Sequence, residues 1–395
     1  MSYIENIPSV AHNVKSEGWV GMRQAVKDFT RCVMEKTLRA ELEEYLGCRY
    51  HERSQKRLTY ANGTYTRSLS TSFGVIERFN VPRCRVGGFQ SVLFDQYQRR
   101  TAELDRSCLA WYLQGESCRD VTRSLQAWCQ DVLSAQSVSR VIQSVDRELM
   151  LWRHRRLSEG LSAVWLDGFS VRVRVKHKVR SYTILMALGR HQDGRWEVLS
   201  FQLADEESNR RWSALLEQMR SQGMRTELFV HDGAAGISGA LRRVYPQVKT
   251  QRCLVHKIRN ILDVLVDQRN RSAIQHDFWS IYQAEDEAQA HERYRVFCRK
   301  WIRSEPQAVK IAKGAWLSTI TYLQVKDAEL RSLCRSTNMI ELFYRELRRR
   351  VKVIGSFPTP ESAERITFMT IRYIEAINLN KSRNMTSLLN QFTHN

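Results

Sequence analysis

The sequence predicts a mixed α/β protein, in which a mostly helical N-terminal region precedes an α/β core with an all-helical insertion. Three observations support this fold class: helical periodicity up to about residue 150, alternating strand-like and helix-like segments over residues 161–260, and helical patterning alone from there to about residue 330. We therefore divide the chain into five consecutive regions, namely 1–100, 101–160, 161–260, 261–330 and 331–395.

The charge balance points to a polyanionic partner. The 395 residues include 62 lysines and arginines against 42 aspartates and glutamates, a net charge of +20. Nucleic acid is the commonest partner of so basic a protein, and a ribosome-associated protein or a basic enzyme without such a partner is the alternative. Nine scattered cysteines are typical of a reducing cytosol. Neither an export signal nor a membrane-spanning apolar stretch is visible, so we expect a cytoplasmic protein.

Residues 1–100 are expected to serve DNA binding or dimerisation. Apolar residues at helical spacing predict a helix over residues 19–47, with Gly47 as its C-terminal cap. Residues 50–95 contain short β-rich pieces, and Asn62-Gly63 predicts a turn between two strands.

Residues 101–150 show helical patterning in three short pieces. The breaks lie at Gly115-Glu116-Ser117 and at Leu133-Ser134, where a serine oxygen can cap the next helix. Helix, turn and helix in a basic protein favour a helix-turn-helix, whose last helix, about 136–148, would lie in the major groove. An ordinary three-helix packing unit is the alternative. The candidate DNA contacts here are Arg119, Gln136, Ser137, Ser139 and Arg140.

From residue 161 the order of elements changes. The expected elements are strands at 161–175, 182–189 and 196–203 with turns at 178–180 and Asp193-Gly194, a helix at 211–222, a strand ending at Asp232, a helix at 237–244, and a strand or turn near 249–255. Three hairpin-linked strands followed by helix, strand, helix and strand are the order of a ribonuclease-H-like catalytic core, in which carboxylates on the first and fourth strands converge.

Three acidic residues are the candidate catalytic and metal-binding groups. Asp167 and Asp232 each follow an apolar strand and precede a glycine. Glu341 follows Ser336-Thr337-Asn338, a helix-start signal that places it in a first turn. Competing choices for the third acid are Glu346 and Glu361. Hard cations such as Mg²⁺ prefer carboxylate oxygens, and two such ions can clamp the attacking and leaving oxygens of a phosphodiester.

Asp232 and Glu341 stand 109 positions apart, which is too far for a loop in a compact domain. Residues 261–330 are therefore expected to form an inserted helical subdomain. We expect its tryptophans to lie in the core, although one could instead stack on a distorted or flipped base. These tryptophans are Trp279, Trp301 and Trp316.

Cys253 and His256 have the spacing of a zinc-ligand pair. A structural zinc site needs four ligands, however, and no second pair stands at suitable spacing. We expect the pair to pack near the active site and to orient a carboxylate or a helix.

Basic side chains accompany the candidate acids. Those beyond Glu341 are Arg345, Arg348, Arg349, Arg350 and Lys352, and those on the first strand include Arg172 and Arg174. Beside a metal site they would contact the phosphate backbone of DNA. A solvated helix face and a protected sheet edge are the alternatives.

With these residues, the chain resembles the mutator-type transposases of bacterial insertion sequences, DDE transposases related to eukaryotic Mutator-like elements. The likeness extends over roughly residues 35–375. It depends on Leu38–Leu42 with Leu46-Gly47, Asn62-Gly63 with Tyr65 and Arg67, Val81–Arg83, Gly115–Val121, Leu166–Gly168, His231–Gly233 with Gly236, Gln251–Asn260, and Thr337–Glu341 with Arg345, Arg350 and Gly355–Phe357. Ala61 and Tyr344 stand where this family usually has arginine and asparagine. Since neither is a metal ligand, we expect these departures to affect DNA contacts more than chemistry.

The resemblance implies that Asp167, Asp232 and Glu341 bind two Mg²⁺ or Mn²⁺ ions. The enzyme would hydrolyse one strand at the end of its element and join the freed 3′-hydroxyl to target DNA. Its partners would be double-stranded DNA, both terminal inverted repeats and target, and a second copy of the chain in a synaptic complex associated with the bacterial nucleoid. Two rivals are a catalytically inactive regulator derived from a transposase and a ribonuclease-H-like nuclease without strand transfer.

Overall fold

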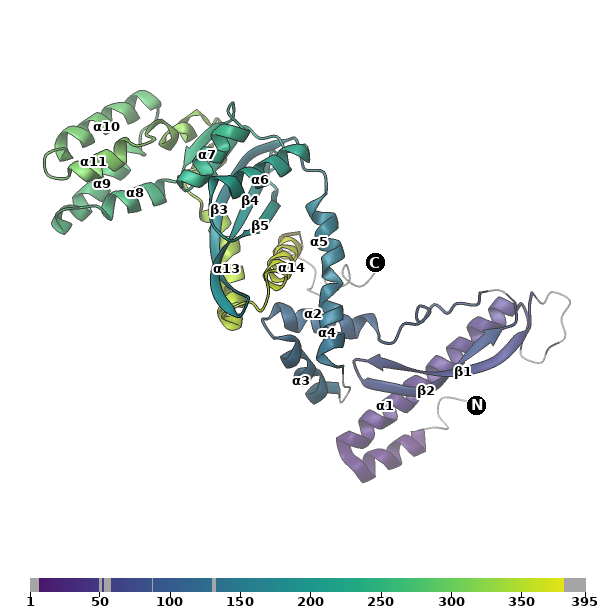
Figure 1. Cartoon of the computed structure of the whole chain (residues 1–395). Coiled ribbons are helices and arrows are strands. Elements are labelled where there is room, and N and C mark those ends of the chain that lie inside the picture. Colours follow the sequence, from purple (N-terminus) through teal and green to yellow (C-terminus); the bar gives the residue numbers. More distant parts are fainter. Residues whose placement is uncertain (1–6, 50–51, 53–57, 87, 130–132, 380–395) are drawn as a thin grey trace. The chain divides into compact units, whose positions relative to one another are not determined.

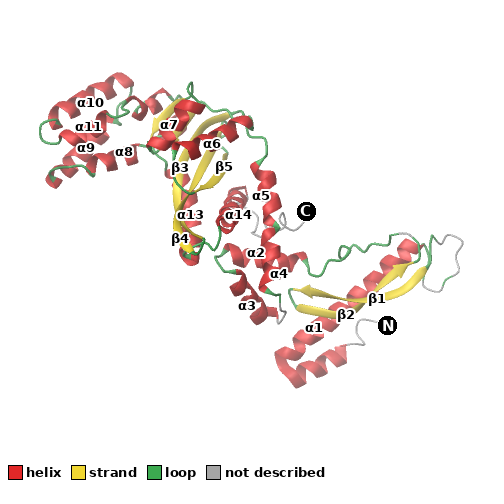
Figure 2. Cartoon of the chain, in the orientation of Figure 1, coloured by secondary structure: helices red, strands yellow, loops and turns green. Residues whose placement is uncertain are grey.

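Figure 1 shows the computed structural model of the chain, which describes residues 7–379 except 50–51, 53–57, 87 and 130–132. The chain forms two compact units, which meet in the sequence between Val145 and Asp146. Each unit contains helices and strands (Figure 2), so the expectation of a mixed α/β protein is confirmed. In the part of the chain that is described, no helix is both long and apolar enough to cross a membrane.

The first unit begins with a long helix that packs on a two-stranded antiparallel hairpin. Helix α1 (Ile7–Leu46) has a kink at Gly18 and ends where Gly47 adopts a φ of 70°, so the expected cap is confirmed. The hairpin consists of β1 (Ala61–Thr71) and β2 (Gly74–Cys84). The small core of this part contains Leu38, Leu69, Ile76, Phe79, Val81 and Phe94.

The prediction of a hairpin turn at Asn62-Gly63 is wrong. Thr71 pairs with Gly74 across a two-residue turn, whereas Asn62-Gly63 lies inside β1 at an irregularity of the pairing between Ala61 and Thr64. Gly63 has a φ of 66°, so the glycine does mark a left-handed backbone position. It serves a bulge rather than a turn.

Three short helices complete the first unit, and they pack against one another. They are α2 (Ala102–Leu113), α3 (Cys118–Cys129) and α4 (Ala135–Gln143). Both expected serine caps are confirmed: the Ser117 hydroxyl accepts from the Asp120 amide at 3.3 Å, and the Ser134 hydroxyl accepts from the Ser137 amide at 3.2 Å. The single helix expected over about 136–148 is instead two, because α4 ends at Gln143 and α5 (Val145–Arg153) follows it into the second unit.

A five-stranded mixed sheet forms the centre of the second unit. Its strands are β3 (Leu161–Val175), β4 (Lys178–His191), β5 (Trp196–Ala204), β6 (Leu228–His231) and β7 (Lys249–Arg252). Their order across the sheet is β5-β4-β3-β6-β7, with β3, β4 and β5 antiparallel and β6 and β7 parallel to β3. The strands follow the predicted order. One turn differs, since Lys176 and His177, both at positive φ, connect β3 to β4, and residues 178–180 belong to β4.

Helices cover both faces of this sheet. Helices α6 (Asn209–Ser221) and α7 (Ala235–Val244) share a core with Val164 and Leu166 of β3. Helices α13 (Asn338–Ile354) and α14 (Pro360–Leu379) also pack on β3. Trp165 points to the face opposite Val164 and Leu166, and its indole N–H donates to the Ser336 carbonyl at 3.1 Å, just before α13. Since side chains alternate along a strand, Asp167 shares the face of Trp165 and α13.

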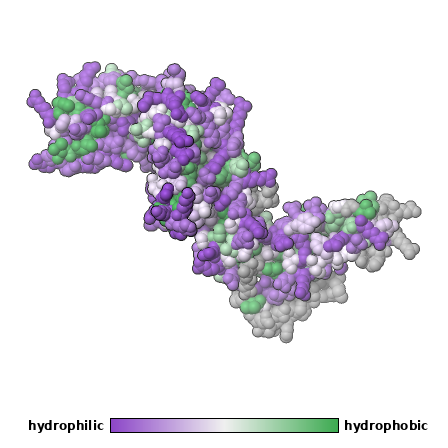
Figure 3. All heavy atoms as spheres, viewed as in Figure 1, coloured by the Kyte–Doolittle hydropathy of each residue, from purple (hydrophilic) through white to green (hydrophobic). Residues whose placement is uncertain are grey.

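All elements between β7 and α13 are helical. They are α8 (Leu254–Leu262), η1 (Gln268–Asn270), α9 (Arg271–Ile281), α10 (Glu287–Trp301), α11 (Pro306–Lys313), η2 (Leu317–Thr319), η3 (Thr321–Gln324) and α12 (Ala328–Leu333). Trp301 and Trp316 are buried, in agreement with core packing, while Trp279 is half-buried. Hydrophilic residues predominate on the face shown in Figure 3.

Candidate functional site

The parallel pairing of β3 with β6 brings Asp167 and Asp232 together. Leu166 lies opposite His231 in the register, and each aspartate is the next residue of its own segment. Strand β3 continues through Asp167, whereas β6 ends at His231, so Asp232 begins the connection to α7. Both aspartates are half-buried. The site therefore lies at the end of β6, beside β3, which continues past it.

Backbone amides orient the two carboxylates. The Gly168 N–H donates to Asp167 Oδ1 at 2.9 Å, and the Ala234 N–H donates to Asp232 Oδ1 at 2.8 Å. Gly233 has a φ of 90°, and a Cβ at this position would overlap the side chain of Arg252. The second Asp-Gly pair thus reflects a backbone position that only glycine fills without strain.

The charges of both other acids act on Asp167. Burial and the negative charge of Asp232 raise the pKa of Asp167 to about 7, and the charge of Glu341 adds to this shift. The Gly168 amide and His256 act in the opposite direction without offsetting it. A carboxyl group whose pKa is raised by neighbouring negative charges is one whose ionised form a divalent cation stabilises.

Helix α13 positions Glu341. This residue is exposed and lies in the first turn of the helix. One turn later, the buried Tyr344 donates its hydroxyl hydrogen to the backbone carbonyl of Asp167 at 2.7 Å, and its ring stacks on Phe169 at 5.1 Å between centroids. These contacts fix the start of α13 on β3 and keep the backbone of Glu341 near Asp167.

The two competing acids have other surroundings. Glu346 forms ion pairs with Arg349 at 2.8 Å and Arg350 at 3.4 Å. Glu361 lies in the first turn of α14, and it is exposed. The engagement of Glu346 with two arginines favours Glu341 as the third acid.

The position of Tyr344 corrects one expectation. We expected its departure from the family pattern to affect DNA contacts, but the side chain is only 2% exposed and faces the strand that carries Asp167. Tyr344 therefore supports the geometry of the acids.

We expect Tyr344→Phe to lower the free energy of unfolding by about 1 kcal/mol, because the Asp167 carbonyl loses its hydroxyl donor. This corresponds to a drop in Tm of about 2–4 °C, measurable by calorimetry. Tyr97→Phe is the matched control, since Tyr97 is 83% exposed and its substitution should leave Tm unchanged. An unchanged Tm in Tyr344→Phe would contradict the anchoring role.

A fourth carboxylate, Glu207, lies close to the aspartates and was missed in the sequence. Its Oε1 accepts from the Trp212 indole N–H at 3.1 Å, and a Cβ on Gly168 would lie 2.9 Å from its Oε2. Burial and the charge of Asp232 raise the pKa of Glu207. In the sequence it ends an acidic run directly before the capping Ser208, as at an ordinary helix start. Only the tertiary structure distinguishes it.

Cys253 and His256 lie beside the start of α13. The Thr337 hydroxyl is 3.6 Å from Cys253 Sγ and 3.4 Å from His256 Nδ1. Burial alone would raise the pKa of Cys253, but hydrogen bonds with His256 and Thr337 hold it below its usual value. The hydrogen bond with Cys253 in turn raises the pKa of His256. The pair thus connects the start of α8 with the helix that carries Glu341.

The acids do not form a closed metal site in this conformation. Within the described ranges, no three His, Cys, Asp or Glu side chains stand together in a group that could hold a metal ion. Glu341 is the exposed member of the triad, on a helix anchored by Tyr344, so rotation of its side chain is the movement that could complete a site. Oxygen-only donors suit Mg²⁺ or Mn²⁺ rather than zinc.

The arginines of the second unit that were expected to contact DNA are mostly exposed. The exposed ones are Arg345, Arg348 and Arg349 on α13 and Arg172 and Arg174 on β3. The Arg348 guanidinium lies 5.4 Å from the Phe169 ring centroid, which connects this exposed face of α13 to β3.

Arg350 differs from its neighbours. It is only 6% exposed, donates to the Glu346 carbonyl at 2.7 Å, and lies 4.9 Å from the ring centroid of Tyr373 on α14. The expectation that Arg350 contacts DNA does not hold, because the packing of α13 on α14 removes it from the surface.

The candidate contacts of the first unit are also unequal. Arg119, Gln136 and Arg140 are exposed. Ser137 is half-buried, and its hydroxyl shares a hydrogen bond with the Ser134 hydroxyl at 3.1 Å, so it belongs to the cap of α4.

Comparisons with known proteins agree with these motifs. The family model described as "Transposase, Mutator family" matches residues 8–376. The transposase for insertion sequence element ISRM5 of Rhizobium meliloti is 33% identical over 347 residues, which cover 88% of this chain and 85% of the relative. The transposase for IS1201 of Lactobacillus helveticus is 30% identical, with 89% and 92% covered. The transposase for IS256 in transposon Tn4001 of Staphylococcus aureus is 29% identical, with 86% and 87% covered.

Among solved structures, a Drosophila P element transposase in a strand transfer complex matches 75% of this chain and 85% of its own at 10% identity. Its TM-score of 0.29 is too low to assign a fold. The family model and the relatives suffice without it: the chain belongs to the Mutator family of transposases.

Proposed function

We propose that this transposase has a ribonuclease-H-like core in which Asp167, Asp232 and Glu341 hold two Mg²⁺ or Mn²⁺ ions. The adjacency of Asp167 and Asp232 across the β3–β6 pairing carries the proposal, together with the effect of both other acids on the pKa of Asp167. A sheet of three antiparallel strands extended by two parallel ones, with helices on both faces, supports the assignment of the core.

The residues of the site have distinct roles. Bound ions would activate the attacking oxygen and stabilise the leaving oxygen of a phosphodiester. The amides of Gly168 and Ala234 hold the two aspartates in orientation, and Tyr344 and Trp165 hold the helix of Glu341 on the same strand. No serine or tyrosine nucleophile is required, since hydrolysis and strand transfer both proceed by direct attack on phosphorus.

The substrate is double-stranded DNA carrying the terminal inverted repeats of an insertion sequence, together with target DNA. The net charge of +20 and the exposed arginines of α13 beside Glu341 support a polyanionic substrate at this site. Helices α3 and α4 carry the exposed Arg119, Gln136 and Arg140 toward the repeats. A homodimer brings two ends together.

The test is a strand-cleavage and strand-transfer assay with the purified protein and a labelled duplex that contains the flanking repeat. Metal-dependent cutting followed by joining to target DNA is expected, and both should stop on chelation. Binding without cutting would favour the inactive regulator, and cutting without joining would favour the nuclease. Either result overturns the proposal.

Substitution of two arginines of α13 should distinguish a side chain that contacts DNA from one that is packed inside the protein. Arg345→Ala should weaken DNA binding and reduce the slope of log K against log salt by about 0.9, as for one lost phosphate contact. Arg350→Ala should lower Tm and leave this slope unchanged, because Arg350 is buried against Tyr373. Fluorescence anisotropy at several salt concentrations and thermal unfolding measure both. If the two variants exchanged these effects, the assignment of Arg345 to the DNA-facing surface would be wrong.

A further inference from the structure

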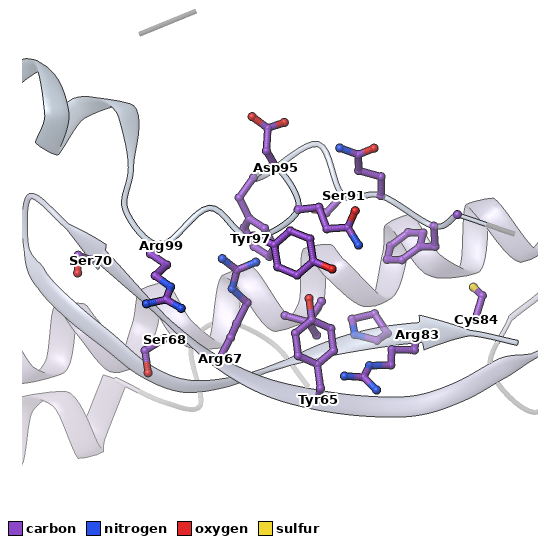
Figure 4. A pocket seen from close by; sticks show the side chains of 17 residues that line it. Tyr65, Arg67, Ser68, Ser70, Arg83, Cys84, Ser91, Asp95, Tyr97 and Arg99 are labelled. Carbon is purple, nitrogen blue, oxygen red and sulfur yellow. The ribbon is translucent and has the colours of Figure 1, made fainter. Parts of the chain in front are cut away.

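The first unit contains a groove that is separate from the acidic residues. It lies between the β1–β2 hairpin and the segment around residues 88–99, with a cavity volume of about 860 Å³ (Figure 4). Its most distinctive side chains are three arginines, two tyrosines and one acid, namely Arg67, Arg83, Arg99, Tyr65, Tyr97 and Asp95.

The three arginines are spread along the groove. Figure 4 places Arg99 toward one end, Arg83 toward the other, and Arg67 between them. None of the three forms an ion pair within the described part of the chain, and the Asp95 carboxylate points away from them in Figure 4. A row of cationic groups of this kind is suited to contact the phosphates of a nucleic-acid backbone.

Two of these arginines are held by aromatic rings. The Arg83 guanidinium lies 4.4 Å from the ring centroid of Tyr65, and the Arg67 guanidinium lies 4.4 Å from that of Phe94. These contacts restrict the side chains and leave their N–H groups available. Less conformational entropy is then lost when an anion binds.

Tyr97 is displayed to solvent by an ordered backbone. It is 83% exposed and has a φ of 69°, a left-handed conformation that is unfavourable for a bulky side chain. Hydrogen bonds on both sides fix the segment: the Asp95 amide donates to Gln98 Oε1 at 2.9 Å, and the Ser70 amide donates to the Arg99 carbonyl at 2.9 Å. In the part of the chain that is described, no aromatic ring stacks on Tyr97, so this strained, exposed ring at the mouth of a cationic groove is available as a stacking platform.

We propose that this groove binds a single-stranded segment of DNA, with phosphates on Arg67, Arg83 and Arg99 and a base stacked on Tyr97. Cationic groups that follow a backbone, combined with exposed aromatic rings, are the features of single-strand recognition. Bases in an intact duplex are already stacked on their neighbours, so their faces are not available to Tyr97. A peptide ligand would have to offer acidic side chains to the arginines and apolar side chains to the aromatic rings. The positive charge of the groove favours a polyanion instead. This site does not depend on the acids of β3 and β6.

The proposal is tested by fluorescence anisotropy in the absence of divalent metal. The full-length protein is titrated against a labelled oligothymidine of about ten nucleotides. Tyr97→Asn removes the ring and retains a residue that tolerates positive φ. It should weaken single-strand binding about fivefold to hundredfold, as for loss of one stacked base. Arg99→Gln should weaken binding and reduce the salt slope by about 0.7.

Phe73→Asn is the matched control, because Phe73 is an exposed aromatic residue at the hairpin turn and does not line the groove. The affinity of this variant for the oligothymidine should equal that of the unmodified protein. A duplex of the same length and mixed sequence should be bound with equal affinity by Tyr97→Asn, by Phe73→Asn and by the unmodified protein. Unchanged single-strand affinity in Tyr97→Asn, or an equal loss for single strand and duplex, overturns the proposal. Cross-linking of an iodouracil oligonucleotide, mapped by mass spectrometry, should identify Tyr97 or Tyr65. Cross-links confined to residues outside the groove would reject the proposal.

Discussion

Asp167→Asn is expected to abolish strand cleavage, with a loss of at least about a thousandfold in rate, while the fold and DNA binding persist. Asparagine retains the size of the side chain and an oxygen for the Gly168 amide, but it lacks the negative charge that a divalent ion needs. The loss of several kcal/mol of transition-state stabilisation produces a rate effect of this size. Nicking of a labelled repeat-containing duplex measures it.

The same variant has a second readout that does not depend on activity. Burial and the charge of Asp232 raise the pKa of Asp167 to about 7, so at pH 8 the ionised carboxylate destabilises the folded protein without metal relative to the unfolded chain. Removing that charge should leave Tm without metal equal or higher, and it should abolish the increase in Tm on adding Mg²⁺.

Asp193→Asn is the control for this experiment. Asp193 lies in the exposed β4–β5 turn, accepts from the Arg195 amide at 2.9 Å, and has no part in the site. This variant should cleave at the normal rate and respond normally to Mg²⁺. Full cleavage by Asp167→Asn would refute the assignment of the acids.

The two aspartates were predictable because their signals are local. Each ends an apolar run and precedes a glycine, and the order of strands and helices is sufficient to expect them on neighbouring strands. The cap at Gly47 and those at Ser117 and Ser134 were predictable for the same reason, since a cap depends on residues within one helical turn.

Features that depend on distant packing were not predictable in this way. The bond from Tyr344 to the Asp167 carbonyl joins residues 177 positions apart, and Glu207 reaches the aspartates only through the placement of α6. Arg350 is an intermediate case. A helix with Phe343 and Leu347 on its buried face also buries the position three residues later, so a run of arginines on one helix cannot be wholly exposed.

Lys257→Met is expected to have the largest effect on stability, and the effect should depend on pH. Lys257 of α8 is fully buried and donates to the carbonyls of Ile311 and Gly314 at the end of α11. Methionine fills a similar volume but leaves these two acceptors without their donor, at a cost of roughly 1–3 kcal/mol each. Chemical denaturation at several pH values measures the difference.

The sign of the pH dependence follows from the lowered pKa of Lys257. Burial, with a smaller effect of the Arg252 charge, lowers this pKa to about 7, against the ordinary lysine value of 10.5 in the unfolded chain. Between these values the unfolded chain binds more protons, so the free energy of unfolding should rise by about 1.4 kcal/mol per pH unit from pH 7 to 10. Below pH 7 the amine is charged in both states, and the full cost of burying the charge is present.

The variant lacks this titration, so its stability relative to the unmodified protein should fall steadily as pH rises from 7 to 10. Lys313→Met provides the control, since Lys313 is exposed on the same helix end and its substitution should retain the normal pH profile. Parallel profiles for Lys257→Met and the unmodified protein would show that Lys257 remains charged over this range. The neutral amine would then have no part in capping α11, and the contact between α8 and α11 would depend on a buried charge instead.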